Sequence, residues 1–388
     1  MLIDRLRQIF DENFSQRGEL GAALSVWRDG REIASLAGGF CDREKTKPWT
    51  ASTPVLVWSA TKGPAAACVL HCLEKHALSP EARVSEIWPE FAARGKQEVT
   101  VGHVLSHQAG LPLLPPDVSV FDHEAIAAWL AAQPPLWPPG SAHGYHPRTF
   151  GFLLDEIVRR LAGMKLGEYW RRTFAEPLNL DAWIGVPEDR LASVAPIFSP
   201  RSPGLPDTPF FNAYSDPDSL TFKTFAPAKG IGGVGGMNTR EARMASLPAF
   251  GGVATAAALA RFYAMLAGGG ELDGTRFFSP RAIGWMTAAR VSAIDKILCV
   301  ETAFSAGFMK SGSGPGAAMV AASRSIAAPG RLPHSAPSPS AFGHPGSGGS
   351  LAFADPENRI AFAYVMNQMD IELLPNEKSL RLVDAVYA

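Results

Sequence analysis

The sequence predicts an α+β fold: a central antiparallel sheet built from both ends of the chain, flanked by helices, with a helical lobe inserted between the two halves. Strand-forming residues alternate in residues 21–39 and again in residues 349–368, whereas the middle of the chain has mainly helical periodicity. With 388 residues and 46% hydrophobic content, the chain can bury a large core or two smaller ones.

Each strand region contains a hairpin signal. Asp29-Gly30 separates two runs of strand-forming residues, and a second hairpin turns at Pro356-Glu357-Asn358. The stretch MLIDRLRQIFDENF has the spacing of an amphipathic helix, and NEKSLRLVDAVYA predicts a closing helix. Both chain ends therefore contribute strands and helices to one layered structure.

Helical periodicity between the ends predicts the second lobe. Pro-rich and Gly-rich loops separate its helical segments, which are residues 99–112, 121–133, 149–163 and 251–266. Before this lobe, residues 59–78 predict a buried central helix whose N-terminus presents Ser59. We expect an α/β domain of residues 1–85 and 285–388 and a mainly helical domain of residues 86–284, with the active site at their interface. Two long irregular stretches, about 196–240 and 311–345, are expected to wall a substrate site or to form plain surface loops.

Charge and composition narrow the class of partner. The formal net charge is -1 and no block of like charges occurs, so we expect neither nucleic acid nor an anionic membrane as partner. No apolar stretch reaches the ~20 residues of a membrane span, and the start lacks a signal-peptide pattern, so a cytoplasmic location is expected. The oligomeric state stays open. Reduced, buried thiols are expected for the cysteines, Cys41, Cys68, Cys72 and Cys299.

Ser59 and Lys62 in the stretch VWSATKGP are the first candidates for chemistry. On a helix, residues three apart lie on one face and can touch. The Ser-x-x-Lys pattern alone is weak, since this composition would produce about one by chance. A serine at a helix N-terminus, however, lies beside unpaired N–H groups that can stabilise an oxyanion, which favours a catalytic role.

A serine nucleophile also needs a base. A lysine with its ordinary pKa of about 10.4 is protonated at neutral pH unless burial or another cation lowers that pKa. Tyr145, on a loop before a predicted helix, is a second candidate, because the Lys62 ammonium would favour a phenolate beside it. The alternative for Tyr145 is an ordinary structural tyrosine.

A glycine-rich run, FGHPGSGGSLAF, supplies the third element. The glycines, Gly346, Gly348 and Gly349, allow the backbone to approach a ligand closely. The N–H of Ser347 could then pair with that of Ser59 as a two-donor oxyanion hole. The alternative is a plain turn.

Other chemical signals are weak. His103 and His107 lie four apart, but the glutamate of an HExxH zinc motif is missing, so we interpret them as structural. His143 and His146 flank Tyr145, and we expect no metal there either. No G-x-S-x-G elbow, dinucleotide-binding or P-loop fingerprint occurs, and no cofactor is expected.

The ordered motifs SATK, YHPRTFG and GHPGSGG resemble those of the serine hydrolases of the class C β-lactamase and penicillin-binding protein superfamily. The esterase branch, the family VIII carboxylesterases, is the most similar. Two supporting segments, TVGHVLSHQAGLP and PAFGGVATAAALARFYAMLAGGG, extend the resemblance over most of the chain. The resemblance implies a β-lactamase-like fold.

For the site, the resemblance implies Ser59 as the acylated nucleophile, Lys62 as its proton partner, and Tyr145 as base and later proton donor. It also places His344-Pro345-Gly346 where relatives carry Lys-Thr-Gly. Pro147 stands where the lactamase branch has the Asn of Tyr-x-Asn. Loss of that Asn and of the fixed charge of the Lys favours neutral esters.

The sequence thus predicts a metal-free, cofactor-free carboxylesterase that hydrolyses short-chain or aryl esters through an acyl-enzyme. Three alternatives stay open: a hydrolase of β-lactams resembling β-lactamases and DD-peptidases, an acyltransferase, and a non-catalytic ligand-binding relative. The candidate wall residues of an apolar pocket are Trp137, Phe210, Phe211 and Phe225.

Overall fold

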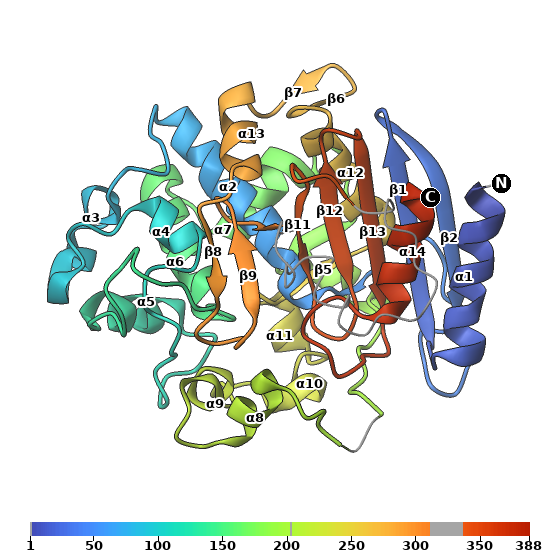
Figure 1. Ribbon diagram of the computed structural model, residues 1–388, viewed down its shortest axis with the longest axis horizontal. Helices are drawn as coiled ribbons and strands as arrows, with labels where there is room; N and C mark the ends of the chain where they lie inside the picture. Colours follow the sequence, from blue (N-terminus) through green and yellow to red (C-terminus); the bar gives the residue numbers. More distant parts are fainter. Residues whose placement is uncertain (1, 202–203, 311–336) are drawn as a thin grey trace.

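A computed structural model describes residues 2–201, 204–310 and 337–388. Within these ranges, eight strands form one sheet in the order β2-β1-β13-β12-β11-β10-β9-β8. Every neighbouring pair is antiparallel. Figure 1 shows strands from both chain ends side by side, which confirms the predicted fold class. The strands are β1 Gly21–Arg28, β2 Arg31–Gly39, β8 Val291–Ile294, β9 Glu301–Phe304, β10 Met309–Lys310, β11 Phe342–Pro345, β12 Leu351–Asp355 and β13 Ile360–Met366.

Both predicted hairpins are present. Asp29 and Gly30 have φ angles of 51° and 74° between β1 and β2, which is the geometry that favours Asp-Gly in a two-residue turn. The second hairpin joins β12 to β13, with Leu351 opposite Tyr364. The predicted terminal helices are α1 Leu2–Gln16 and α14 Glu377–Tyr387, which pack on each other.

The sheet is covered on both faces. In Figure 1, α1 and α14 lie in front of the sheet, and α12 (Ala256–Ala267) lies behind it. The helix α12 contacts β13, β1 and β12. Every residue of β13 is buried, as expected for a strand with neither face in water. The helix α12 thus packs on the sheet although it falls inside residues 86–284, which were expected to form the helical domain. The division into two domains stays a prediction.

The remaining helices form the lobe beside the sheet (Figure 1). The central helix is α2 (Lys62–Lys75), which contacts α6 (Thr149–Ala162) and α7 (Leu166–Trp170). The other α-helices are α3 Val84–Ile87, α4 Val101–Leu105, α5 His123–Ala132, α8 Pro209–Ser215, α9 Leu220–Phe225, α10 Gly233–Gly236, α11 Arg240–Met244 and α13 Pro280–Thr287. The 3₁₀ helices are Trp58–Thr61, Pro89–Gly95 and Glu188–Ser193, and Arg171–Ala175 is a π-helix.

Two small sheets complete the structure in the described ranges. One has the order β3-β5-β4, and the other is the pair β6-β7. Their strands are β3 Val55–Leu56, β4 Ala182–Ile184, β5 Gly252–Ala254, β6 Glu271–Leu272 and β7 Thr275–Arg276. The first matters for function, because β3 leads directly into the turn that carries Ser59.

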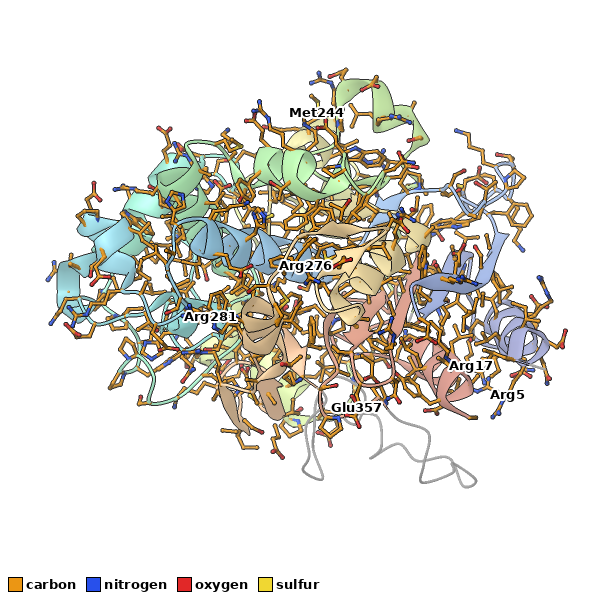
Figure 2. The ribbon with its side chains drawn as sticks, turned by 90° about the horizontal axis from the view of Figure 1, so that it is seen from above. Arg5, Arg17, Met244, Arg276, Arg281 and Glu357 are labelled. Atoms are coloured by element: carbon orange, nitrogen blue, oxygen red, sulfur yellow. The ribbon has the colours of Figure 1, made fainter. Side chains whose placement is uncertain are left out.

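Charged side chains lie mainly on the outside. Figure 2 labels three charged residues that are exposed to solvent, Arg5, Arg281 and Glu357. Among the described residues, no helix is both long and apolar enough to span a membrane.

Candidate active site

Ser59 lies in the 3₁₀ helix Trp58–Thr61, between β3 and α2, and the start of this helix is strained. The residue before Ser59, Trp58, has a φ of 47°, a value that is rare for a bulky side chain. Such strain persists where the surroundings hold it in place, and it concentrates at functional sites. Here the surroundings are β5: the Val57 N–H donates to the Gly252 carbonyl at 2.9 Å, and the Gly252 N–H donates to Thr61 Oγ1 at 2.9 Å.

Lys62 begins α2 and is completely buried. Its Nζ lies 3.1 Å from Ser59 Oγ and 2.9 Å from each of two carbonyl oxygens, those of Pro147 and Ala249. Burial lowers the pKa of Lys62 well below its ordinary value, and the charge of Arg148 lowers it further. A neutral amine fits this geometry, because its two N–H groups can face the carbonyls while its lone pair faces Ser59.

Tyr145 lies on the loop that precedes α6, as predicted. Its N–H donates to Asp295 Oδ1 at 2.9 Å, and its ring centroid lies 4.7 Å from Lys62 Nζ. Burial raises the pKa of Tyr145, although a hydrogen bond with Ser59 offsets part of this effect. The expectation of a phenolate stabilised by Lys62 is therefore wrong in sign: burial favours the neutral phenol and also the neutral amine.

The glycine-rich run forms the end of β11 and the turn after it. A Cβ built on Gly346 would lie 2.2 Å from the carbonyl oxygen of Val57, so only glycine fits where the turn packs on the segment before Ser59. Gly348 has a φ of 88°, which also favours glycine. Among the described residues, the backbone N–H groups of Ser59 and Ser347 donate to no protein acceptor.

His344 is neutral in this environment. Burial lowers its pKa to about 3, and the nearby Lys62 contributes to the shift. Its Nδ1 lies 2.7 Å from the Pro345 carbonyl oxygen, so Nδ1 carries the proton and donates it. Its ring lies against Tyr145, with centroids 5.8 Å apart.

A cavity of about 140 Å³ opens beside Ser59. Of the predicted site residues, Ser59, Tyr145, His344 and Ser347 line it, while Lys62 contacts Ser59 and is not among the lining residues. The wall is mainly apolar. Its lining residues are Trp58, Ser59, Tyr145, Pro147, Arg148, Phe225, Phe250, Leu298, Met309, His344, Pro345, Ser347, Leu373 and Leu374.

The predicted wall is confirmed only at Phe225. Trp137, Phe210 and Phe211 are not among the lining residues, and Phe210 packs against Phe225 with ring centroids 5.6 Å apart. Most of the second irregular stretch, residues 311–336, lies outside the described residues.

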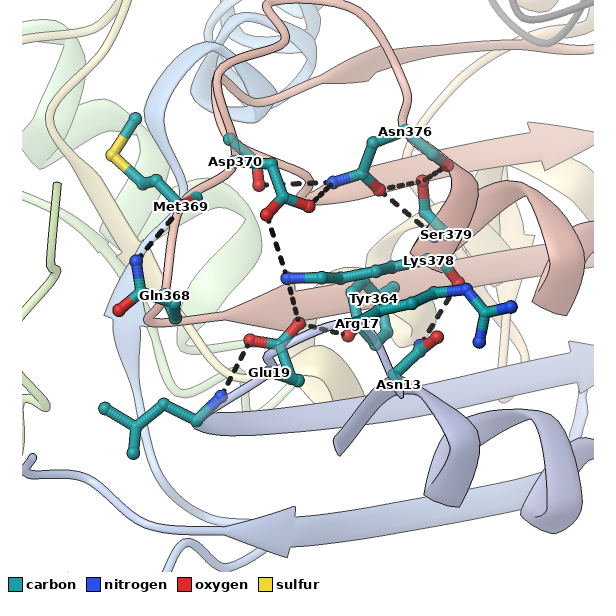
Figure 3. Close-up of polar contacts among 12 residues, drawn as sticks. Asn13, Arg17, Glu19, Tyr364, Gln368, Met369, Asp370, Asn376, Lys378 and Ser379 are labelled. Atoms are coloured by element: carbon teal, nitrogen blue, oxygen red, sulfur yellow. Dashed lines mark hydrogen bonds and ion pairs between the residues drawn. The ribbon is translucent and has the colours of Figure 1, made fainter. Parts of the chain in front are cut away.

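A polar network around the buried Lys378 (Figure 3) contacts the turn at Gly348 through Asp370. Lys378 Nζ lies 3.4 Å from Glu19 Oε2 and 3.1 Å from Asp370 Oδ1. The Asp370 N–H donates to the Gly348 carbonyl at 3.0 Å, and Asn376 Nδ2 donates to Asp370 Oδ2 at 2.7 Å. The segment between Asp370 and Asn376 contains the cavity residues Leu373 and Leu374, so this network fixes the turn and one wall together.

Sequence reasoning missed several residues of the site. Asp295 accepts backbone N–H groups from Tyr145, Ile297 and Leu298, and therefore holds the Tyr145 loop in place. No local pattern pointed to it. Arg148 had a signal, since it lies three residues after Tyr145 in the same motif.

The histidines named above have structural contacts. His146 Nε2 accepts the Leu111 N–H at 2.9 Å, and His143 Nε2 lies 2.7 Å from Thr302 Oγ1. His103 Nδ1 accepts the Thr100 N–H, and burial lowers the pKa of His107. In the part of the chain that the structure describes, no group of three or more His, Cys, Asp or Glu side chains could hold a metal ion.

Comparison with known proteins places this geometry in context. The family model described as Beta-lactamase matches residues 6–385. The chain is 34% identical over 369 residues to Esterase/beta-lactamase LipL of Mycobacterium tuberculosis, covering 93% of this chain and 80% of LipL. It is 30% identical over 199 residues to Esterase EstB of Burkholderia gladioli, covering 46% of this chain and 50% of EstB.

Solved structures agree over the whole chain. A penicillin-binding protein homologue from Caulobacter crescentus has a TM-score of 0.84 and 36% identity, covering 100% of this chain and 97% of its own. A family VIII carboxylesterase has a TM-score of 0.84 and 31% identity, with the same coverage.

Proposed function

The chain belongs to the beta-lactamase family of serine hydrolases, and within it we propose that this protein is a carboxylesterase acting on short-chain or aryl esters through a Ser59 acyl-enzyme. The predicted family is confirmed, and so is the resemblance to family VIII carboxylesterases. The observation that carries the proposal is the contact between Ser59 Oγ and the buried, pKa-lowered Lys62, beside a mainly apolar cavity.

Acylation begins at Ser59. The neutral amine of Lys62 takes the hydroxyl proton of Ser59 as Oγ attacks the ester carbonyl. The two N–H groups of this amine donate to the carbonyls of Pro147 and Ala249, so the lone pair of the amine is left to accept the proton. This assigns Lys62 rather than Tyr145 as the acylation base. The N–H groups of Ser59 and Ser347 donate to the developing oxyanion, since neither has a partner among the described residues.

Tyr145 completes the proton path. Its phenol is protonated in the resting enzyme and contacts Ser59, so it can give its proton to the leaving alcohol while Lys62 holds the proton from Ser59. In the second step the phenolate takes a proton from the attacking water, and the Lys62 ammonium returns its proton to Ser59 Oγ. Water then hydrolyses the acyl-enzyme and releases the acid. A Tyr145→Phe variant with full kcat would contradict this role.

Hydrolysis of p-nitrophenyl butyrate, with nitrocefin measured in parallel, tests the proposal. We expect ester hydrolysis by the wild type and a loss of about a thousandfold or more in Ser59→Ala. Equal activity of both proteins would place the site elsewhere.

Turnover of nitrocefin without ester hydrolysis would favour the β-lactamase alternative, and transfer of the acyl group to an added alcohol in preference to water would favour the acyltransferase. Failure of a serine-directed phosphonate to label Ser59 would indicate a non-catalytic relative. A cytoplasmic location stays a prediction.

A further inference from the structure

Arg148 places a guanidinium at the wall of the Ser59 cavity. It is the residue before α6 and lines the cavity together with Tyr145 and Phe225. Its two terminal nitrogens donate to main-chain carbonyls at the end of α9, to Phe225 at 3.0 Å and to Ala226. These bonds hold the guanidinium in one orientation.

The positive charge of Arg148 is not neutralised by a carboxylate. Both acceptors are neutral carbonyls, and among the described residues no Asp or Glu forms an ion pair with Arg148. The partial negative charge at the end of a short helix offsets only part of a full charge. Charges that are largely removed from water are normally paired, so an unpaired guanidinium beside a nucleophile indicates a ligand.

Part of the guanidinium is still free to donate. Beyond its bonds to Phe225 and Ala226, Arg148 donates to no acceptor among the described residues, and each terminal nitrogen carries a second N–H. A guanidinium commonly pairs with a carboxylate through its N–H donors, so Arg148 offers a free donor and a full charge to such a group.

We propose that the preferred ester carries a carboxylate, which Arg148 binds while Ser59 attacks the ester carbonyl. This inference rests on the proposed esterase function and narrows its substrate class. It replaces the expectation of neutral esters, which rested on Pro147 in place of the Asn and on His344 in place of the Lys and did not consider Arg148. The positive charge of the site is at Arg148, the residue before α6.

Matched ester pairs test the inference at pH 7.5, where the carboxylate is ionised. In the first pair, ethyl hydrogen succinate carries a carboxylate on the acyl side of the ester, and ethyl butyrate is its neutral counterpart. In the second pair, 3-acetoxybenzoate carries the carboxylate on the alcohol side, and phenyl acetate is its neutral counterpart. We expect kcat/KM for the charged member of one pair to exceed that for the neutral member at least tenfold, and the responding pair identifies the side.

Substitution of Arg148 should remove this preference. Arg148→Met is expected to lower the charged-to-neutral ratio of kcat/KM about tenfold or more, mainly through KM, and Arg148→Lys should restore part of it. Arg240→Met, which removes an exposed arginine paired with Glu188, is the matched control and should leave the ratio unchanged. Neutral esters hydrolysed as well as charged ones by the wild type, or a ratio unaffected in Arg148→Met, would overturn the inference.

A binding measurement separates this inference from the proposed function. Calorimetric titration of Ser59→Ala with ethyl hydrogen succinate and with ethyl butyrate requires no turnover. Tighter binding of the charged ester, lost in Ser59→Ala/Arg148→Met, supports the Arg148 site even if no ester is hydrolysed. Equal binding of both esters overturns it even if the esterase function holds.

Discussion

Lys62 Nζ lies 3.1 Å from Ser59 Oγ and has carbonyl oxygens, not carboxylates, as its other partners. A carboxylate would stabilise the ammonium form and raise the pKa of Lys62. Burial among neutral carbonyls has the opposite effect and lowers the pKa of Lys62. The chain therefore holds a proton acceptor within reach of Ser59 without using a histidine as base.

Lys62→Arg should abolish this base while keeping a cation at the position. A guanidinium is not deprotonated in proteins, so kcat/KM for p-nitrophenyl butyrate should fall by about 10² to 10⁴. Lys62→Met, which removes the amine altogether, should lose a similar factor while remaining folded by circular dichroism. Retention of more than a tenth of wild-type activity in Lys62→Met would contradict the role of Lys62 as base.

Gly346→Ala should disrupt the contact between the β11 turn and the segment before Ser59. The added Cβ would lie 2.2 Å from the Val57 carbonyl oxygen. Both groups belong to the backbone, so the clash can be relieved only by moving main chain. We expect a loss of about 2 kcal/mol or more in the free energy of unfolding, with reduced kcat. Gly284→Ala, in α13 with open space around it, is the control and should be neutral or stabilising by up to about 1 kcal/mol. Equal urea midpoints for the two variants would contradict the packing argument.

Lys378→Met should destabilise the fold through the network in Figure 3. It leaves Glu19 and Asp370 without their shared cation, and burial already raises the pKa of both carboxyls. Breaking such a pair costs about 3–5 kcal/mol. Adding Glu19→Gln should recover part of the lost stability, because it removes one of the two carboxylates that no longer have Lys378 as a partner. Urea unfolding of the single and double variants measures this, and a double variant less stable than Lys378→Met would argue against it.

His146 should make the fold sensitive to acid. Its Nε2 accepts the Leu111 N–H and its Nδ1 faces the Gly144 carbonyl, so only the neutral ring satisfies both partners, and burial lowers its pKa to about 3. Between pH 6.5 and 3 the unfolded chain binds the extra proton, so the free energy of unfolding falls as pH falls, by up to about 1.4 kcal/mol per pH unit.

The matched variant for this acid effect is His146→Gln. Its stability at pH 7.5 is expected to be lower, but its loss of stability between pH 6.5 and 4.5 should be smaller than that of the wild type. Denaturant unfolding at several pH values gives both slopes. Parallel slopes would show that His146 does not titrate on unfolding.

Local patterns predicted the features that depend on neighbours in sequence. The Asp29-Gly30 turn, the helix after Ser59 and the order of the three motifs are examples. The short strands β8, β9 and β10 were not predicted individually, because two to four residues carry too little periodicity and their pairing is set by the sheet. The helix predicted within residues 99–112 is also shorter than expected, since α4 ends at Leu105.

The chemistry of the site depended on burial, which the sequence does not display. The proximity of Lys62 and Tyr145 was foreseen, but the direction of the Tyr145 pKa shift was not, because it depends on how completely the ring is enclosed. Likewise, Arg148 was visible in its motif, yet its lack of a carboxylate partner among the described residues is a property of the packed chain.

Trapping the acyl-enzyme tests the central role of Ser59 most directly. The protein is mixed with p-nitrophenyl butyrate, quenched in acid within the first turnovers, and digested for mass spectrometry. We predict a butyryl adduct on the peptide containing Ser59, which is absent from Ser59→Ala. An adduct on a different serine, or rapid hydrolysis by Ser59→Ala with no adduct in either protein, would contradict the Ser59 mechanism.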